Sequence, residues 1–453
     1  MPEAGFGSLI VMLISIAILV TLIMKLKIHP VYALIFTGVI AALGFGFPID
    51  QIFSTITGGF GGTIGNIGIV IILGCAIGII LEDTGGALVL ANTILKAVGK
   101  KNSALAMALT GYLVSIPVFS DSAIVIMSPV ARALSARAGV PLVGLLGALN
   151  AGILATHTMV PPTPGPLAAA GTLGADLGLV IVLGLISSAF YTLAASLFCN
   201  SKYMLNKYPA VAKMEGVDKA QGDDFILKGK DGKPLPSAFL AFASILVPVI
   251  LICAQSFGNM FLPKESGLIP VLTFIGNPIF ALFVGVVIAL FLDKSRLSLD
   301  QMYKWFSDSV EESGFIILAT GAAGAFGGVL KASGVGTYLG NLIASTAIPA
   351  VFVPFLVSVL LSVANGSATV ALTTGSAILL PLVEPLGLSP VIATLSIAAG
   401  SSFFYHANAS HFWVVLKSND DLPMNEGYEL VSVATAIGAV AGMIGVWIMS
   451  FIF

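Results

Sequence analysis

Two histidines stand 249 positions apart in a strongly apolar chain, and the sequence around them repeats at the same offset. The shift that carries His157 onto His406 (406 − 157 = 249) also carries Gly78 onto Gly327. An ionisable side chain at membrane depth usually serves a function, and imidazole exchanges a proton near neutral pH. The repeat therefore predicts proton coupling by both histidines, with a hydrogen bond between helices as the alternative role.

Three polar residues, Ser120, Asp121 and Ser122, follow Pro117 within an apolar stretch. Proline interrupts the helical hydrogen-bond ladder, and serine and aspartate are favoured at the N-cap of the next helix. A helix N-terminus within the membrane offers free backbone N–H groups and the positive end of a dipole, which suit a carboxylate. We predict that these three residues bind substrate, and that Asp121 either caps the helix or carries the coupled proton.

A second polar break lies at Asn365-Gly366-Ser367 and is followed by Thr369. Interrupted backbone at membrane depth is tolerated only where protein or a water-filled cavity satisfies it. We predict that these four residues also bind substrate. Close helix packing through small residues is the alternative.

Unwound backbone is predicted next to both histidines. Four prolines lie between positions 161 and 166, after His157, and enclose Thr163, so a helix cannot continue there. Asn408 follows His406, and His411 lies a few residues further along. Thr163 and Asn408, together with His157 and His406 themselves, complete the predicted substrate-binding set, whereas His411 receives no assigned role.

The elements that must position these residues are membrane helices. Of 453 residues, 57% are hydrophobic and only 9% are charged, against about 25% charged in soluble domains. Apolar runs of about 20 residues, the length that spans a bilayer, recur along the chain. No basic patch suggests a nucleic-acid partner, and the three cysteines are interpreted as packing residues. No catalytic dyad, phosphate loop or metal-ligand spacing is found, so we predict no enzyme activity, no metal and no cofactor beyond a coupling ion.

The chain divides at its only long polar stretch, the lysine-rich segment 200–236. This predicts a transmembrane half at 1–199 (repeat core about 60–199), a cytoplasmic linker at 200–236 and a second half at 237–453 (repeat core about 307–453). Lysine and arginine favour the cytoplasmic side, and their distribution orients the span at 64–82 opposite to its partner at 311–330. The predicted fold is an all-α polytopic membrane protein with two inverted-topology repeats, each with a re-entrant helical hairpin.

Several short motifs resemble those of the gluconate permease family, part of the ion-transporter superfamily, over essentially the whole chain. They are Thr84-Gly85-Gly86-Ala87, Phe119-x-Asp121, His157 with Pro161-Pro162-x-Pro164-Gly165-Pro166, and His406-x-Asn408-x-x-x-Phe412-Trp413. The resemblance implies proton-coupled uptake of a small organic anion across the cell (inner) membrane. It also implies a homodimer in the lipid bilayer that moves substrate by an elevator-like step.

Two positions differ from the pattern of that family. Thr163 stands where histidine is usual, and Ala409 stands where aspartate is usual. Fewer polar groups favour a small acid such as 3-hydroxybutyrate or lactate over a sugar acid. From the resemblance as a whole we predict symport of a small organic acid, such as gluconate or another hydroxy-carboxylate, with protons. Sodium coupling, or a D-serine or 3-hydroxybutyrate permease, is the alternative within transport; a membrane enzyme, a channel and a sensor are alternatives from other classes.

Overall fold

The computed structural model describes residues 5–98, 102–212, 235–263, 265–293, 297–338, 349–407, 409–419 and 422–453. Every regular element in these ranges is a helix, and seven helical stretches are long and apolar enough to cross a bilayer. Helices satisfy their own backbone hydrogen bonds, which hydrocarbon requires. The predicted all-α polytopic architecture is confirmed.

The first half of the chain contains α1 (Phe6–Met24), α2 (Pro30–Gly44), α3 (Ile49–Thr84), α4 (Gly86–Val98), α5 (Ser103–Val114), α6 (Ser120–Ala138), α7 (Leu142–Met159), α8 (Pro164–Leu173), α9 (Leu177–Cys199) and α10 (Lys202–Lys207). The apolar sequence from 166 to 199 thus forms parts of two helices, α8 and α9. Gly174 ends α8 in a left-handed conformation (φ 69°), and Asp176 begins α9 by accepting the backbone N–H of Leu179. The predicted linker begins with α10, while positions 213–234 lie outside the described residues.

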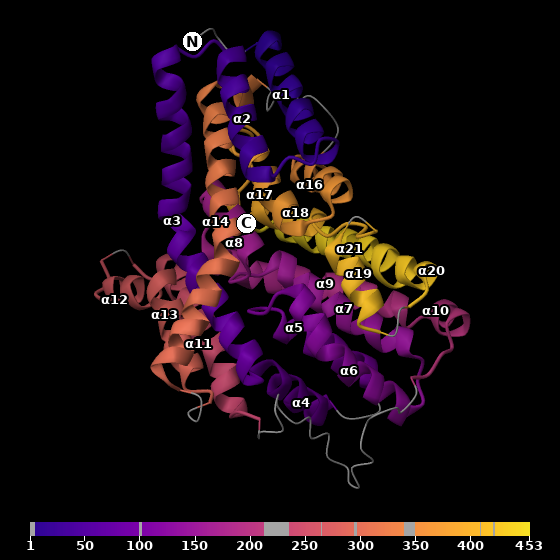
Figure 1. Cartoon of the computed structure of the whole chain (residues 1–453). Coiled ribbons are helices and arrows are strands. Elements are labelled where there is room, and N and C mark those ends of the chain that lie inside the picture. The colour runs from indigo at the N-terminus through magenta and orange to yellow at the C-terminus, as the bar shows by residue number, and fades with distance from the viewer. Residues whose placement is uncertain are drawn as a thin grey trace.

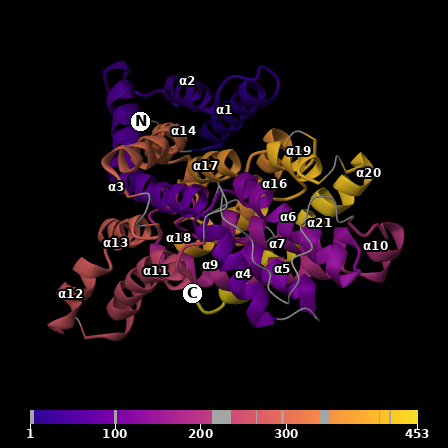
Figure 2. The same ribbon diagram turned by 60° about the horizontal axis from the view of Figure 1, so that its bottom comes forward.

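The second half contains α11 (Ala238–Phe261), α12 (Leu268–Ile275), α13 (Pro278–Leu290), α14 (Leu299–Ala332), α16 (Phe352–Asn365), α17 (Ala368–Leu379), α18 (Pro390–Gly400), α19 (Ser410–Lys417), α20 (Met424–Gly427), the π-helix η3 (Tyr428–Val433) and α21 (Ala434–Met449). Helices α12 and α13 meet at a bend of 55°, as in a broken span or a re-entrant loop. Figures 1 and 2 show α10 and α20 at the edge of the molecule opposite α12.

The two longest helices, α3 and α14, lie side by side (Figure 1). At one end, the indole N–H of Trp305 donates to Asp83, with 3.0 Å between nitrogen and oxygen. Further along, Gly59 lies directly against the backbone of Gly324. Because the end of α3 meets the start of α14, the two helices are antiparallel. This arrangement is what an inverted repeat requires of corresponding spans, although the repeat itself stays a prediction.

Each long helix also holds one helical hairpin through a glycine. Gly78 of α3 lies against the carbonyl oxygen of Pro117, in the loop between α5 and α6. Gly327 of α14 lies against Ala377 of α17, and a Cβ at Gly327 would sit 2.9 Å from the Ala377 carbonyl oxygen. A side chain at either glycine would push the hairpin away. The glycines that match at the 249-residue offset thus each contact the hairpin of their own half, Gly78 at the tip loop and Gly327 near the C-terminal end of α17.

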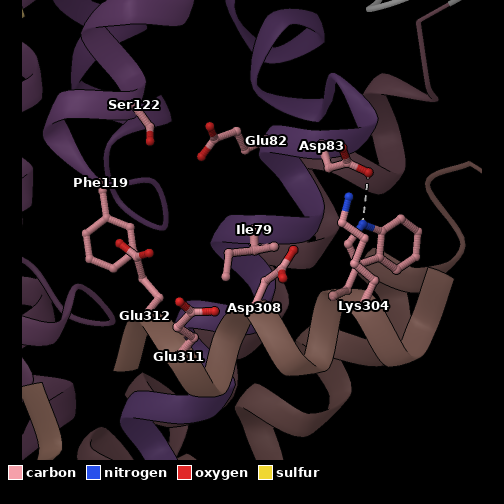
Figure 3. A pocket seen from close by; sticks show the side chains of 10 residues that line it. Ile79, Glu82, Asp83, Phe119, Ser122, Lys304, Asp308, Glu311 and Glu312 are labelled. Carbon is pink, nitrogen blue, oxygen red and sulfur yellow. Dashed lines mark hydrogen bonds between the residues drawn. The ribbon is translucent and has the colours of Figure 1, made fainter. Parts of the chain in front are cut away.

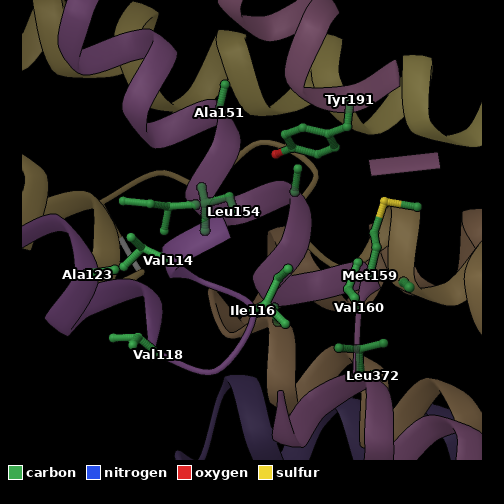
Figure 4. Close-up of a cluster of buried hydrophobic side chains, with 14 of the residues drawn as sticks. Val114, Ile116, Val118, Ala123, Ala151, Leu154, Met159, Val160, Tyr191 and Leu372 are labelled. Carbon is green, nitrogen blue, oxygen red and sulfur yellow. The ribbon is translucent and has the colours of Figure 1, made fainter. Parts of the chain in front are cut away.

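The core is centred on α7 and α8, and 94% of the residues in an 18-residue apolar window of the stretch Leu142–Leu173 are buried. A helix buried on all sides cannot face lipid, so this stretch lies inside the bundle. Figure 4 shows Ile116 and Val118 from the first hairpin gathered with Leu154 of α7 and Leu372 of α17 in one apolar cluster. Side chains from both halves thus fix the position of the hairpin tips.

Candidate transport site

The first hairpin tip is the loop between α5 and α6. Phe119 is the residue preceding α6, and no side chain caps this helix; Ser120 is its first residue. The prediction that the serine–aspartate cluster caps the helix is wrong. The Asp121 carboxylate instead bonds Ser410 and His411 of α19, in the other half. The first N–H groups of α6 have no partner within the helix.

A chain of hydrogen bonds joins the two halves at this tip. His411 Nδ1 lies 2.8 Å from Asp121 Oδ1, and its Nε2 lies 2.7 Å from Asn150 Oδ1 of α7. The hydroxyl of Ser410 donates to the second carboxylate oxygen of Asp121, with 3.1 Å between the oxygens. His411 and Asn150 are 3% and 1% exposed, whereas the Asp121 side chain is 43% exposed. Only the carboxylate end of this chain meets solvent.

His157 lies near the same tip. Its ring centroid is 6.3 Å from that of Phe119, and it interacts electrostatically with Asp121 and His411. Its Nδ1 atom is buried and has no hydrogen-bond partner among the described residues. The structure therefore brings His157 and Asp121 into one region, as the two predicted proton-coupling groups of the first half.

The second hairpin tip lies between α16 and α17. Gly366 ends α16 with a left-handed backbone (φ 71°), which glycine adopts without strain. Ser367 caps α17 by accepting the N–H of Val370. The next backbone N–H, that of Ala368, donates to the hydroxyl oxygen of Tyr405 over 3.0 Å. A protein hydroxyl therefore already occupies the N-terminus at which a substrate carboxylate was expected. The side chain of Asn365 lies outside the described residues.

His406 lies beside this second tip. Its Nε2 is 3.1 Å from the carbonyl oxygen of Val363, in the last turn of α16. Each repeated histidine thus sits next to the hairpin of its own half. The hydrogen-bonded chain at Asp121 includes His411 and not His406, and Asn408 lies outside the described residues.

The start of α8 meets the start of α17. A Cβ on Gly165 would lie 3.7 Å from the Cα of Thr369 and 3.8 Å from its hydroxyl oxygen. Thr163, which precedes α8, is buried and donates its hydroxyl to the Val160 carbonyl over 2.6 Å. The N-termini of α6 and α19 also meet, through the contact of Asp121 with His411. In both pairs, α8 with α17 and α6 with α19, one helix comes from each half and the positive ends of the two helix dipoles face one another.

A cavity of about 400 Å³ reaches the first tip from the side on which α3 ends and α14 begins. Figure 3 shows Ser122 and Phe119 of the tip beside it. Its acidic lining residues are Glu82, Asp83, Asp308, Glu311 and Glu312, with Lys304 as the cation among them. Glu82 and Asp83 at the end of α3 thus line an opening. Its negative charge would repel an anion, so a substrate carboxylate fits the helix N-termini better than this cavity.

Sequence reasoning did not find Asn150 or Tyr405 and gave His411 no role. Asn150 lies within an apolar run, and its only signal was an amide at membrane depth, which is costly unless it is bonded. Tyr405 precedes His406 and has no local signature, because its partner is 37 residues away. Their roles depend on contacts between helices that periodicity does not specify.

Comparison with known proteins agrees with this architecture. The family model described as GntP family permease matches residues 7–452. A permease of Haemophilus influenzae is 35% identical over 98% of this chain and 92% of its own length. A gluconate permease of Pseudomonas aeruginosa is 31% identical over 97% of both chains, and the D-serine transporter DsdX of Escherichia coli is 32% identical over 97% and 98%.

Solved structures show the same fold at low sequence identity. The YdaH transporter of Alcanivorax borkumensis superimposes with a TM-score of 0.66 and 14% identity, covering 88% of both chains. MtrF of Neisseria gonorrhoeae gives a TM-score of 0.68 and 15% identity, covering 96% of this chain and 97% of that one. The helical bundle, the length of the match and the identity to named permeases agree. The chain belongs to the GntP permease family, and it is a multi-pass transport protein of the cell inner membrane and not an enzyme.

Proposed function

We propose that this permease carries a small organic acid, such as gluconate or another hydroxy-carboxylate, into the cell together with a proton. The observation that carries the proposal is the contact between Asp121 and His411, where α6 of one half meets α19 of the other. A carboxylate and an imidazole at membrane depth can share and release a proton. The exposed carboxylate gives that proton a route to water.

The substrate carboxylate binds, in this proposal, at the facing N-termini of α8 and α17. The partial positive charge of two helix ends suits an anion. The N–H groups that remain for it are those of Gly165 and Thr369, because Pro164 and Pro166 have none and those of Ala368 and Val370 are already bonded. The hydroxyls of Thr163 and Thr369 lie at these ends and would bind the hydroxyl groups of the acid. The residues assigned to substrate are Ser120, Asp121, Ser122, His157, Thr163, Asn365, Gly366, Ser367, Thr369, His406 and Asn408. Asp121, His157 and His406 are assigned to proton coupling.

The relatives support an organic acid without selecting one. One is named a gluconate permease and another a D-serine transporter. Both substrates carry a carboxylate and at least one hydroxyl group, which is the chemistry that the helix ends and threonines offer. A D-serine or 3-hydroxybutyrate permease is therefore the alternative substrate class. A homodimer and an elevator-like movement of the hairpins are further parts of the proposal.

Purified protein in liposomes tests coupling. We expect uptake of radiolabelled gluconate, 3-hydroxybutyrate or D-serine to rise with an imposed inward proton gradient, and to be unchanged when choline replaces sodium at fixed pH. Uptake that follows sodium and ignores the pH gradient would replace proton coupling by sodium coupling. Uptake that ignores both gradients would reject symport.

A thermal-shift screen of the same acids tests substrate identity. A ligand that binds the folded state stabilises it by RT ln(1 + [L]/Kd). We expect one acid of the panel to raise the unfolding temperature more than its decarboxylated analogue does. Equal shifts for the acid and the analogue would argue against a carboxylate site.

A further inference from the structure

The proposed proton site contains an amide whose orientation restricts its chemistry. Both ring nitrogens of His411 face oxygen atoms, Nδ1 facing Asp121 and Nε2 facing Asn150. An amide oxygen accepts hydrogen bonds and does not donate them. A hydrogen on Nε2 therefore donates to Asn150. A second proton, when the imidazole carries one, lies between Nδ1 and the Asp121 carboxylate, and this is the proton that can leave.

We propose that Asn150 is a positioning residue that makes the contact between α6 and α19 depend on the transported proton; the proposal rests on proton-coupled transport. When the proton is present, Nδ1–H bonds to the Asp121 carboxylate and the pair has no net charge. When it leaves, it passes from Nδ1 to the carboxylate oxygen and from there to water. The imidazole is then neutral with its hydrogen on Nε2, and the Nδ1 lone pair faces the Asp121 carboxylate. Two facing acceptors repel, so the contact opens.

Without Asn150 the same pair would behave differently. A neutral imidazole can place its single hydrogen on either nitrogen. If nothing held Nε2–H, that hydrogen would move to Nδ1 and keep the bond to Asp121 after the proton had left. The contact between the halves would then survive deprotonation. Asn150 is thus what converts loss of a proton into loss of a contact.

Other titratable groups surround this pair. His157 on α7 interacts with it electrostatically, and the Tyr405 ring centroid is 6.2 Å from that of His411. Among the described side chains, the remaining charged or titratable groups on α4, α5, α6, α19, α20 and η3 are Lys96, Tyr112, Arg132, Lys417, Glu426, Tyr428 and Glu429. Because both ring nitrogens of His411 are already engaged, none of these groups bonds to it, and Glu429 pairs with Lys207.

Two near-isosteric substitutions test the proposal in proteoliposomes. For one proton per substrate anion, the steady-state accumulation ratio rises about tenfold per unit of imposed pH gradient. We expect Asn150→Leu to transport with a flatter dependence, because the contact no longer responds to the proton. Asn150→Asp retains an oxygen acceptor for Nε2–H but adds a titratable carboxylate beside His411, so we expect it to stay dependent on the pH gradient over a shifted pH range.

Asn419→Leu is the matched control. Asn419 is also 1% exposed and also contacts α6, through Ser128 at 3.2 Å, but it bonds no titratable group within the part of the chain that the structure describes. We expect this variant to lose stability and to keep the wild-type dependence on the pH gradient. A wild-type slope in Asn150→Leu, or an equal loss of slope in Asn419→Leu, would overturn the role of Asn150.

A second readout does not need transport. The thermal unfolding temperature of purified protein is measured from pH 5.5 to 8.5, and we expect its pH dependence to flatten in Asn150→Leu and not in Asn150→Asp. An unchanged pH dependence in Asn150→Leu would overturn the proposal even if that variant does not transport. Failure of proton coupling itself would show in the wild type, as uptake that ignores the pH gradient.

Discussion

The contact between Gly78 and the first hairpin tip allows a quantitative prediction. A Cβ at position 78 would overlap the carbonyl oxygen of Pro117 and lie 3.3 Å from its carbonyl carbon. Both atoms belong to the backbone, so no side chain can rotate away. Overpacking of a tight contact costs about 1–3 kcal/mol, and alanine regains about 0.5–1 kcal/mol in a helix relative to glycine. Gly78→Ala is therefore expected to be destabilising on balance.

The same helix provides a control. Gly65 of α3 has no atom within 4 Å of its ideal Cβ position, so Gly65→Ala gains helix propensity without a collision. Gly327→Ala, at the matching position of the second half, places a Cβ 2.9 Å from the Ala377 carbonyl oxygen. Its stability is expected to lie between those of Gly65→Ala and Gly78→Ala. From highest to lowest, the predicted order of unfolding temperature is Gly65→Ala, Gly327→Ala and Gly78→Ala.

The assay combines unfolding and uptake. Unfolding temperatures of the purified variants are compared in one detergent at one heating rate, because membrane proteins often unfold irreversibly. Uptake in proteoliposomes is expected to fall most in Gly78→Ala, since the displaced tip carries Asp121. If Gly78→Ala matched Gly65→Ala in both measurements, α3 would not hold the hairpin tip through this contact, and the reasoning would be refuted.

Two further predictions concern the tips themselves. Asp121→Asn removes the exposed end of the proton chain, so exchange of substrate across the membrane should persist while accumulation driven by a pH gradient is lost; retained accumulation would count against Asp121 as the coupling group. Tyr405→Phe removes the hydroxyl oxygen that accepts from the buried Ala368 N–H, and an unsatisfied buried donor costs about 1–3 kcal/mol. The unfolding temperature should fall. A substrate carboxylate that accepts from the Ala368 N–H in place of the tyrosine hydroxyl should then raise the unfolding temperature more in this variant than in the wild type. Equal thermal shifts in Tyr405→Phe and the wild type would place the carboxylate elsewhere.

The composition and periodicity of the chain determine its class and much of its local structure. Hydrocarbon leaves helices as the way to satisfy the backbone of long apolar runs, so the helical bundle follows from hydropathy. Pro117 and Gly366 interrupt such runs, and the breaks between α5 and α6 and between α16 and α17 lie at them. The repeated Gly78 and Gly327 are visible at one offset, although their function is not.

Only the tertiary structure decides which polar groups meet. Asp121 and His411 are 290 residues apart, and no local pattern states that the partner of this carboxylate is His411 rather than the repeated His406. The serine–aspartate cluster has the composition of a helix cap, yet a stronger partner on another helix takes its carboxylate. Local rules describe what a segment can form by itself, whereas a buried polar group is satisfied by whichever helix packing brings to it. Asn150 lies in an apolar run, and only the packing of α7 against α6 and α19 gives it a role.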